Sequence, residues 1–263
     1  MNATGRQKKE RSGGYDNHGY ADTSGYIDIH THILPGVDDG AATMEESVRM
    51  VCIAAMEGIS RIILTPHQKA DRRSVTPQGT LRRMKLLQEE LDRRRIPVRF
   101  YPGSEIFYRH GMEELLEKGQ ILTLAGSRYC LVEFFPEEAY TYIRDGLSRL
   151  AACGCRPILA HVERYVQVVE EGRAEELKRQ TGCLYQINAP SLTGETGYVY
   201  KSRSRKLIKM GLADFIATDA HDEKRRKPQL GKCAQWLEKR LGEGEMRRLL
   251  IDNPAAVIAD REL

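Results

Sequence analysis

The feature that most constrains this chain is the pentad Asp28-Ile29-His30-Thr31-His32, which closes a short apolar run. Alternate side chains on a strand share a direction, so His30 and His32 can offer two imidazole nitrogens to one ion. The pattern returns along the chain, because polar motifs follow or end five further apolar runs. These motifs are Thr65-Pro66-His67, Gly103-Ser104-Glu105, Cys130-Leu131-Val132-Glu133, His161-Val162-Glu163-Arg164 and Thr218-Asp219-Ala220-His221.

From Tyr26 onward, short apolar runs alternate with amphipathic stretches, a pattern typical of βα units around a parallel sheet. Seven strands with intervening helices predict an α/β fold, namely a distorted seven-stranded (β/α) barrel of TIM-like type. Such barrels carry their chemistry on the loops after the strands, where the polar motifs occur. The predicted strands lie near 26–29, 61–64, 98–101, 130–134, 156–160, 185–188 and 215–218.

Helix signals agree with this arrangement. A capping box at Thr43-Met44-Glu45-Glu46 begins the first helix, which stops at Gly58. Thr76-Pro77 begins the second helix, because proline suits the first helical turn. Later helices are predicted over 140–152, 173–181, 201–210, 231–241 and 244–251.

The length of 263 residues and the 41% hydrophobic content allow one sizeable α/β core. Residues 1–24 lack the apolar segment of a signal peptide and are rich in Gly, Ser and charge, which predicts a flexible leader before a catalytic domain at 25–263. No run approaches the ~20 apolar residues of a membrane span.

The formal net charge of +4 requires neither nucleic acid nor an anionic membrane as a partner, and it is compatible with an anionic substrate. The 6 cysteines show no repeated Cys-x-x-Cys pairs. Their placement, mostly inside apolar segments, favours reduced thiols in a cytoplasmic protein.

Histidine placement points to metal binding. A single histidine at a strand end is more often a hydrogen-bonded core residue than a ligand. Five of the 7 histidines, however, fall at the same ends of different predicted strands, together with four carboxylates, and this joint occurrence favours a metal site. His18, in the leader, and His110 are read as surface residues. The four carboxylates are Asp39, Glu105, Glu133 and Asp219.

Taken together, these motifs resemble those of the polymerase and histidinol phosphatase (PHP) superfamily. The resemblance covers about residues 25–255, with the motifs in family order. More narrowly, Asp38-Asp39-Gly40 and His161-Val162-Glu163-Arg164-Tyr165 resemble its manganese-dependent protein-tyrosine phosphatase branch. Members of that branch accompany bacterial tyrosine autokinases that control capsular and exopolysaccharide synthesis. The N-terminal extension departs from the family, whose first strand normally begins almost at the first residue.

The resemblance implies three divalent metal ions. Manganese is the metal of the branch, and imidazole and carboxylate ligands without thiolate also suit iron, zinc or magnesium. Four carboxylates against three divalent ions leave a formal charge of about +2, which matches a phosphate dianion. The implied ligand sets are His30, His32, Glu105 and Asp219 for one ion, Glu105, Glu133 and His161 for a second, and Asp39, His67 and His221 for a third.

Two arginines are the candidate phosphate-contacting catalytic residues. Arg164 directly follows the His161 motif, and a guanidinium there could grip phosphate bidentately. The family usually has an arginine near a proline after the Asp219 motif, and here the segment from Asp222 to Pro228 offers four cations, of which Arg226 is favoured. Recognition through phosphate and the aromatic ring predicts little dependence on peptide sequence.

The implied reaction is metal-assisted hydrolysis of a phosphomonoester by water. No cysteine here has an arginine at the offset of a Cys-x5-Arg loop, which excludes the cysteine-based tyrosine phosphatase mechanism. The leading hypothesis is a protein-tyrosine phosphatase acting on the tyrosine-rich tail of a bacterial kinase. A small-molecule phosphoesterase such as a histidinol phosphatase is the runner-up, and a non-enzymatic binding module that has lost its metals is the third.

Overall fold

The computed structural model describes residues 25–69, 74–170 and 172–263. The predicted leader, residues 1–24, lies outside the described residues, so the division into a leader and a catalytic domain stays a prediction. Within the described part no helix is both long and apolar enough to span a membrane.

Each of the seven predicted strand ranges corresponds to an observed strand, and two short strands accompany them. The unpredicted strands are β3 and β5, with two and three residues. The strands are β1 (Tyr26–Thr31), β2 (Ile59–Leu64), β3 (His67–Gln68), β4 (Arg99–Pro102), β5 (Glu105–Phe107), β6 (Tyr129–Glu133), β7 (Arg156–Leu159), β8 (Leu184–Asn188) and β9 (Phe215–Ala217).

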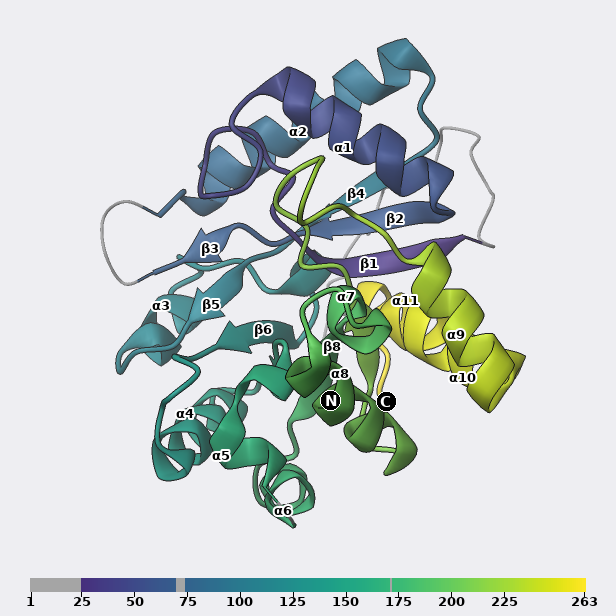
Figure 1. The fold of residues 1–263 in the computed structure, drawn as a ribbon. Coiled ribbons are helices and arrows are strands. Elements are labelled where there is room, and N and C mark those ends of the chain that lie inside the picture. Colours follow the sequence, from purple (N-terminus) through teal and green to yellow (C-terminus); the bar gives the residue numbers. More distant parts are fainter. Residues whose placement is uncertain (1–24, 70–73, 171) are drawn as a thin grey trace, which may run out of the picture.

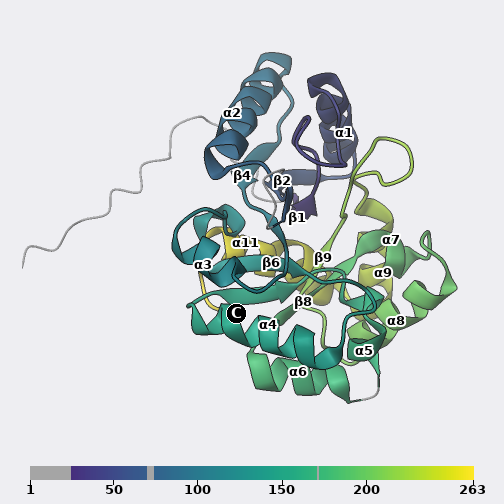
Figure 2. The same cartoon turned by 90° about the vertical axis from the view of Figure 1, so that its left-hand side faces the viewer.

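The strands form two parallel sheets, with orders β1-β2-β4 and β3-β5-β6-β7-β8-β9. The break falls at Thr65-Pro66, between β2 and β3, and at Gly103-Ser104, between β4 and β5. Pro66 has no N–H to donate to a ladder hydrogen bond, so regular strand pairing is interrupted there. At Gly103 the backbone passes so close to β2 that a Cβ would lie 2.9 Å from Ile63 Cγ2, which favours glycine at this position. The predicted α/β class is confirmed, as a fold with a curled parallel sheet (Figures 1 and 2), whereas a seven-stranded TIM-like barrel is not.

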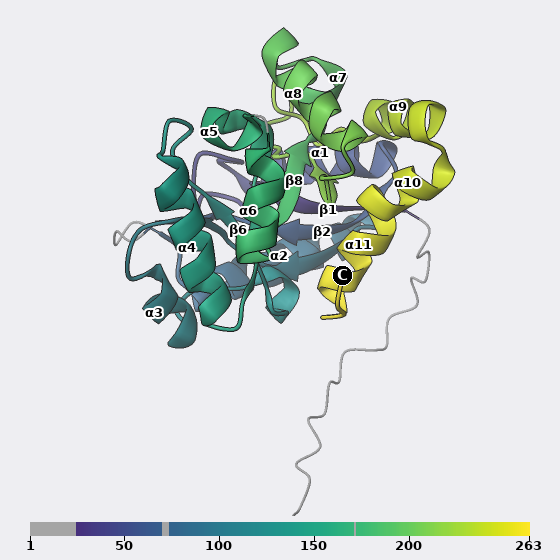
Figure 3. The same cartoon turned by 90° about the horizontal axis from the view of Figure 1, so that it is seen from below.

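Helices cover the outside of the sheets (Figures 1 and 3). α1 contacts β2, α2 contacts β4, α4 contacts β7, and α11 returns to β1. The helices are α1 (Met44–Met56), α2 (Pro77–Arg94), α3 (Met112–Glu117), α4 (Tyr140–Ala152), α5 (Val166–Val169), α6 (Arg173–Thr181), α7 (Ala189–Thr193), α8 (Tyr198–Lys209), α9 (Gly231–Leu241), α10 (Glu243–Arg247) and α11 (Asn253–Ile258), with the 3-10 turns η1 (Leu124–Gly126) and η2 (Val162–Arg164).

The two helix starts predicted from capping motifs are confirmed, whereas the helix predicted over 201–210 begins earlier, at Tyr198. Thr43 Oγ1 accepts a hydrogen bond from Glu46 N at 3.2 Å, and Thr76 Oγ1 accepts one from Gly79 N at 3.1 Å. The helix predicted over 244–251 differs, because α10 passes into the π-helical turn η3 (Arg248–Asp252) and then into α11. Pro254 lacks the N–H that an uninterrupted α-helix would use there, which accounts for the change in winding.

Along β8 and β9, the inward-facing side chains are apolar at the start of the strand and polar at or after its carboxyl end. On β8, Leu184 belongs to the inner core cluster, and Gln186 and Asn188 follow on the same face. On β9, Phe215 and Ala217 belong to the same cluster, and Asp219 comes two residues later. Apolar packing therefore holds the strands whose carboxyl ends carry the polar motifs.

Candidate metal centre

The structure brings all nine predicted metal ligands together at the carboxyl ends of the strands. Backbone hydrogen bonds join the end of β1 to the segment after β9, with Asp219 N donating to His30 O at 2.9 Å and His32 N donating to Ala220 O at 2.8 Å. This pairing places the first two histidines beside Asp219 and His221. The nine residues are His30, His32, Asp39, His67, Glu105, Glu133, His161, Asp219 and His221.

Glu105 is the centre of the cluster. Its side chain is 1% exposed and contacts four imidazoles. Oε1 lies 3.1 Å from both His30 Nε2 and His161 Nε2, while Oε2 lies 3.0 Å from His67 Nδ1 and 3.3 Å from His32 Nε2. The geometry therefore suits a carboxylate that bridges two ions.

A first group of donors consists of His30, His32 and Asp219, each buried, with donor atoms within 4.8 Å of one another. Asp219 Oδ1 lies 3.4 Å from His30 Nε2 and 3.6 Å from His32 Nε2. Glu105 closes this group, in agreement with the first predicted ligand set.

A second group surrounds Glu105 and Glu133. His161 Nε2 lies 3.1 Å from Glu105 and 3.6 Å from Glu133, as the predicted set requires. His67 Nδ1, however, lies 3.0 Å from both carboxylates and forms a candidate group with them. The structure therefore places His67 between the second and third predicted sets.

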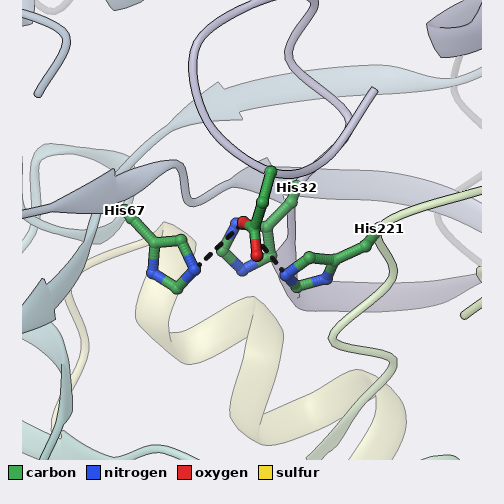
Figure 4. A group of neighbouring side chains, drawn as sticks. His32, His67 and His221 are labelled. Atoms are coloured by element: carbon green, nitrogen blue, oxygen red, sulfur yellow. Dashed lines mark ion pairs between the residues drawn. The ribbon is translucent and has the colours of Figure 1, made fainter. Parts of the chain in front are cut away.

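The third group is the most open. Asp39 Oδ1 lies 3.3 Å from His67 Nε2 and 3.5 Å from His221 Nε2, and its side chain is 66% exposed. His32 joins these donors, with its ring centroid 3.9 Å from that of His221. Figure 4 shows the three imidazoles around the shared carboxylate, with dashed lines for the two ion pairs.

These residues fit divalent ions. Donors that share an ion at about 2.0–2.2 Å lie about 3.0–3.6 Å apart, and the closest nitrogen-to-oxygen distances in the cluster fall in that range. His67 Nδ1 is buried and makes no hydrogen bond in the described structure, although two carboxylates lie 3.0 Å away. The donor set contains imidazole and carboxylate without thiolate, which suits an open catalytic site better than a structural zinc cage.

The electrostatics of the cluster follow from this close pairing. Burial lowers the pKa of His32, but hydrogen bonds to Asp38 and Glu105 outweigh it and raise the pKa to about 9. Burial also opposes ionisation of Glu105, yet the surrounding imidazoles hold its pKa well below the usual range. Hydrogen bonds from His221 and His67 lower the pKa of Asp39 in the same way. The carboxylates are therefore ionised and ready to bind cations.

Three residues that received no role in the sequence analysis support the candidate ligands. Gln186 Oε1 lies 3.0 Å from His30 Nδ1 and accepts a hydrogen bond from His161 N, Asp38 Oδ2 lies 2.8 Å from His32 Nδ1, and Asn188 Nδ2 donates to Asp219 Oδ2 at 2.8 Å. Such contacts fix imidazole orientation and tautomer. The shared face of Leu184, Gln186 and Asn188 could have identified the two amides.

The two predicted arginines meet at one carboxylate oxygen. Arg164 and Arg226 each place a guanidinium nitrogen 2.8 Å from Asp219 Oδ2, and their side chains are 32% and 41% exposed.

His161 and Asp219 both have positive φ, 36° and 54°, which is uncommon for residues with a side chain. Strain of this kind gathers at functional sites. His110, which the sequence analysis assigned to the surface and not to the metal site, is exposed, as predicted.

Fold and site together define an α/β protein with a candidate polynuclear metal centre at the ends of a curled parallel sheet. Residues 26–259 match the family model for capsular polysaccharide synthesis, CpsB/CapC, and the chain belongs to this family. The branch identified by resemblance is thereby confirmed.

Individual relatives agree with the family assignment. The chain is 32% identical over 241 residues to the tyrosine-protein phosphatase CpsB of Streptococcus pneumoniae, covering 89% of this chain and 99% of that protein. It is 32% identical over 237 residues to the tyrosine-protein phosphatase YwqE of Bacillus subtilis (strain 168), covering 90% and 93%.

Solved structures extend the comparison. One from work on YwqE and CpsB, described as unique metal-dependent tyrosine phosphatases, superposes with a TM-score of 0.84 at 31% identity and covers 90% of this chain and 96% of that one. The phosphotriesterase homology protein of Escherichia coli, with a TM-score of 0.55 at 13% identity over 90% of this chain and 99% of that one, shares the fold alone.

Proposed function

We propose that this chain is a metal-dependent protein-tyrosine phosphatase, a phosphomonoester hydrolase. The observation that carries the proposal is the placement of two guanidinium groups, Arg164 and Arg226, at the edge of the cluster formed by the nine predicted metal ligands. A phosphate dianion beside the ions would meet both cations. The names of CpsB and YwqE support the same activity, and the partial exposure of both arginines leaves the site accessible to a side chain on a polypeptide.

The reaction is a hydrolysis. A water oxygen bonds to phosphorus, the bond from phosphorus to the tyrosyl oxygen breaks, and that oxygen takes up a proton. Bound divalent ions would supply charge neutralisation of the phosphoryl oxygens and would make water more acidic.

The chain's own residues hold the substrate in place. Asp219 orients Arg164 and Arg226 and leaves their remaining N–H groups to donate to phosphate. A tyrosyl leaving group has a pKa of about 10, so a dedicated general acid is not required.

Three ions, with manganese as the proposed metal, would be held by the ligand sets inferred from sequence. Glu105 would bridge the first two sets, and its contacts with four imidazoles support that role. The position of His67 beside Glu133 supports close spacing of the second and third ions.

The proposed physiological substrate is the tyrosine-rich tail of a bacterial tyrosine autokinase that controls capsule or exopolysaccharide synthesis. The family's link to capsular polysaccharide synthesis supports this assignment. A cytoplasmic location belongs to the same proposal, and the six free cysteines fit a reducing compartment.

The test is a comparison of substrates on protein of known metal content. Elemental analysis is combined with rates on a phosphotyrosine peptide, a phosphoserine peptide and histidinol phosphate, before chelation, after chelation and after metals are added back. Metal-dependent turnover that is fastest on phosphotyrosine is expected. Faster turnover of histidinol phosphate would favour the small-molecule alternative, and purified protein without metal or activity would favour the binding module.

A further inference from the structure

A cavity of about 350 Å³ adjoins the candidate metal centre on the side of Asp219. Its volume lies within the range of small-molecule sites, so it offers room for more than one phosphate group. Five cationic side chains line it, against two carboxylates, Asp219 and Glu195. The cations are Arg164, Arg225, Arg226, Lys227 and Lys232.

The charges in this cavity are unevenly paired. Arg164 and Arg226 share Asp219, and Lys232 Nζ lies 3.5 Å from Glu195 Oε1. Arg225 and Lys227 have no ion pair with any residue that the structure describes. The function proposed above uses Arg226 and leaves these two neighbouring cations without a role.

The loop that carries them has a fixed backbone. Asp222 Oδ1 accepts hydrogen bonds from Lys224 N and Arg225 N, and Oδ2 accepts one from Arg226 N. His221 N donates to Arg226 O at 2.9 Å, which ties the loop to the metal-binding segment. The backbone is thus held by its own acidic residue, and the basic side chains of 225–227 border the cavity.

We propose that this cavity binds the carboxylate of an aspartate or glutamate close to the phosphotyrosine in the substrate polypeptide. Charge complementarity carries the choice of occupant, because the unpaired cations Arg225 and Lys227 lie next to the proposed phosphate contacts Arg164 and Arg226. An extended chain advances about 3.3 Å per residue, so the acidic residue would lie within a few residues of the phosphotyrosine. The inference rests on the proposed phosphatase function and adds a preference for acidic substrate sequences.

The experiment compares kcat/KM for two phosphotyrosine peptides that differ only in their flanking residues, Asp and Glu in one and Asn and Gln in the other. The metal-loaded full-length chain is measured beside the double variant Arg225→Gln, Lys227→Gln. A matched control, Lys239→Gln with Arg240→Gln, removes the same charge from exposed positions at the far end of α9 that do not line the cavity.

The wild-type chain should prefer the acidic peptide by about five- to tenfold, as two partly exposed ion pairs allow. The double variant should bring this ratio close to one, and the control variant should keep it. Equal rates of the wild-type chain on both peptides, or equal loss of the preference in the control, would overturn the proposal. No turnover of either peptide by metal-loaded wild-type protein would instead count against the phosphatase function itself.

Discussion

The two sides of the candidate metal centre are built differently. On the inner side, His30 and Glu105 are 0% and 1% exposed, and His30 has a supporting contact from Gln186. On the outer side, Asp39 is 66% exposed and His67 is 17% exposed. The inner donors are fixed by the strands and by neighbouring amides. The outer carboxylate comes from the loop before α1 and is held only by imidazoles among the described residues.

This difference indicates how each side responds to ions. Buried charged side chains that are already paired keep their geometry when the metal ion is absent. An exposed carboxylate is held in position mainly by the metal ion that it binds. We therefore expect the inner side to determine folding and catalysis together, and the outer side to contribute mainly when ions are bound.

The largest effect is expected for Glu105→Ala. Removing one partner of a buried charge cluster costs about 3–5 kcal/mol of folding stability, and the loss of a carboxylate shared by two ions should also abolish nearly all activity. Glu133→Ala should cost less, because a terminal ligand serves one ion and a bridging carboxylate serves two. Activity and metal content per chain are measured for both variants. Equal residual rates with equal metal loss would show that Glu105 is not the bridge.

Metal removal should lower the melting temperature of the wild-type chain by about 5–10 °C. An ion present at a free concentration of 100 times its Kd contributes about 2.7 kcal/mol to the free energy of unfolding. Each kcal/mol corresponds to about 2–4 °C in the melting temperature of chains of about 150–250 residues. Thermal denaturation is recorded before and after chelation, with metal loss confirmed by elemental analysis. An unchanged melting temperature would mean that the ions are not coupled to folding.

Arg164→Ala should lower phosphopeptide kcat/KM by about 10–100-fold and leave metal content intact. A hydrogen bond to a charged group contributes about 1.5–3 kcal/mol, and the proposed partner of Arg164 is the substrate phosphate. Arg226→Ala should have the same effect but a smaller one, since its side chain is more exposed than that of Arg164. Full activity in both variants, or loss of metal in either, would refute this role.

Eight of the nine candidate ligands could be found from sequence because they end or closely follow apolar runs, and Asp39 was found through the family motif Asp38-Asp39-Gly40. The sequence could not assign His67 to a single ion, because that depends on the distances of 3.0 Å to Glu105 and Glu133 across different strands. Strands β3 and β5 are too short for a periodic signal.

The supporting residues and the basic cavity were harder to predict for another physical reason. Gln186 and Asn188 are ordinary strand residues until their partners are known. The cavity combines Arg164, the region around α7 and the segment from Thr218 to the start of α9, which come from three separate parts of the sequence. The sequence alone predicted little dependence on peptide sequence, whereas this cavity favours recognition of acidic residues.

The adjacent residues Asp38 and Asp39 allow the sharpest test, because both lie in the loop before α1 but only Asp38 is buried, where it supports the buried ligand candidate His32. The Asp38 side chain is 6% exposed, and its carboxylate accepts hydrogen bonds from Gly40 N and His67 N beside its contact with His32 Nδ1. Asp38→Asn should therefore lower the melting temperature by about 3 °C or more with and without ions, because it weakens buried, charge-assisted hydrogen bonds.

Asp39→Asn is expected to have the smallest effect on stability. The ion pairs of Asp39 are screened by water and contribute about 0.5 kcal/mol, so in chelated protein the variant should change the melting temperature by less than about 2 °C. In metal-loaded protein the same variant should lose part of the stabilisation by ions, because an amide oxygen is a weaker ligand than a carboxylate. Thermal denaturation of both variants, with and without chelator, separates the two contributions. If Asp39→Asn destabilised the chelated protein as much as Asp38→Asn, the outer side would be as preorganised as the inner side, and the distinction between them would fail.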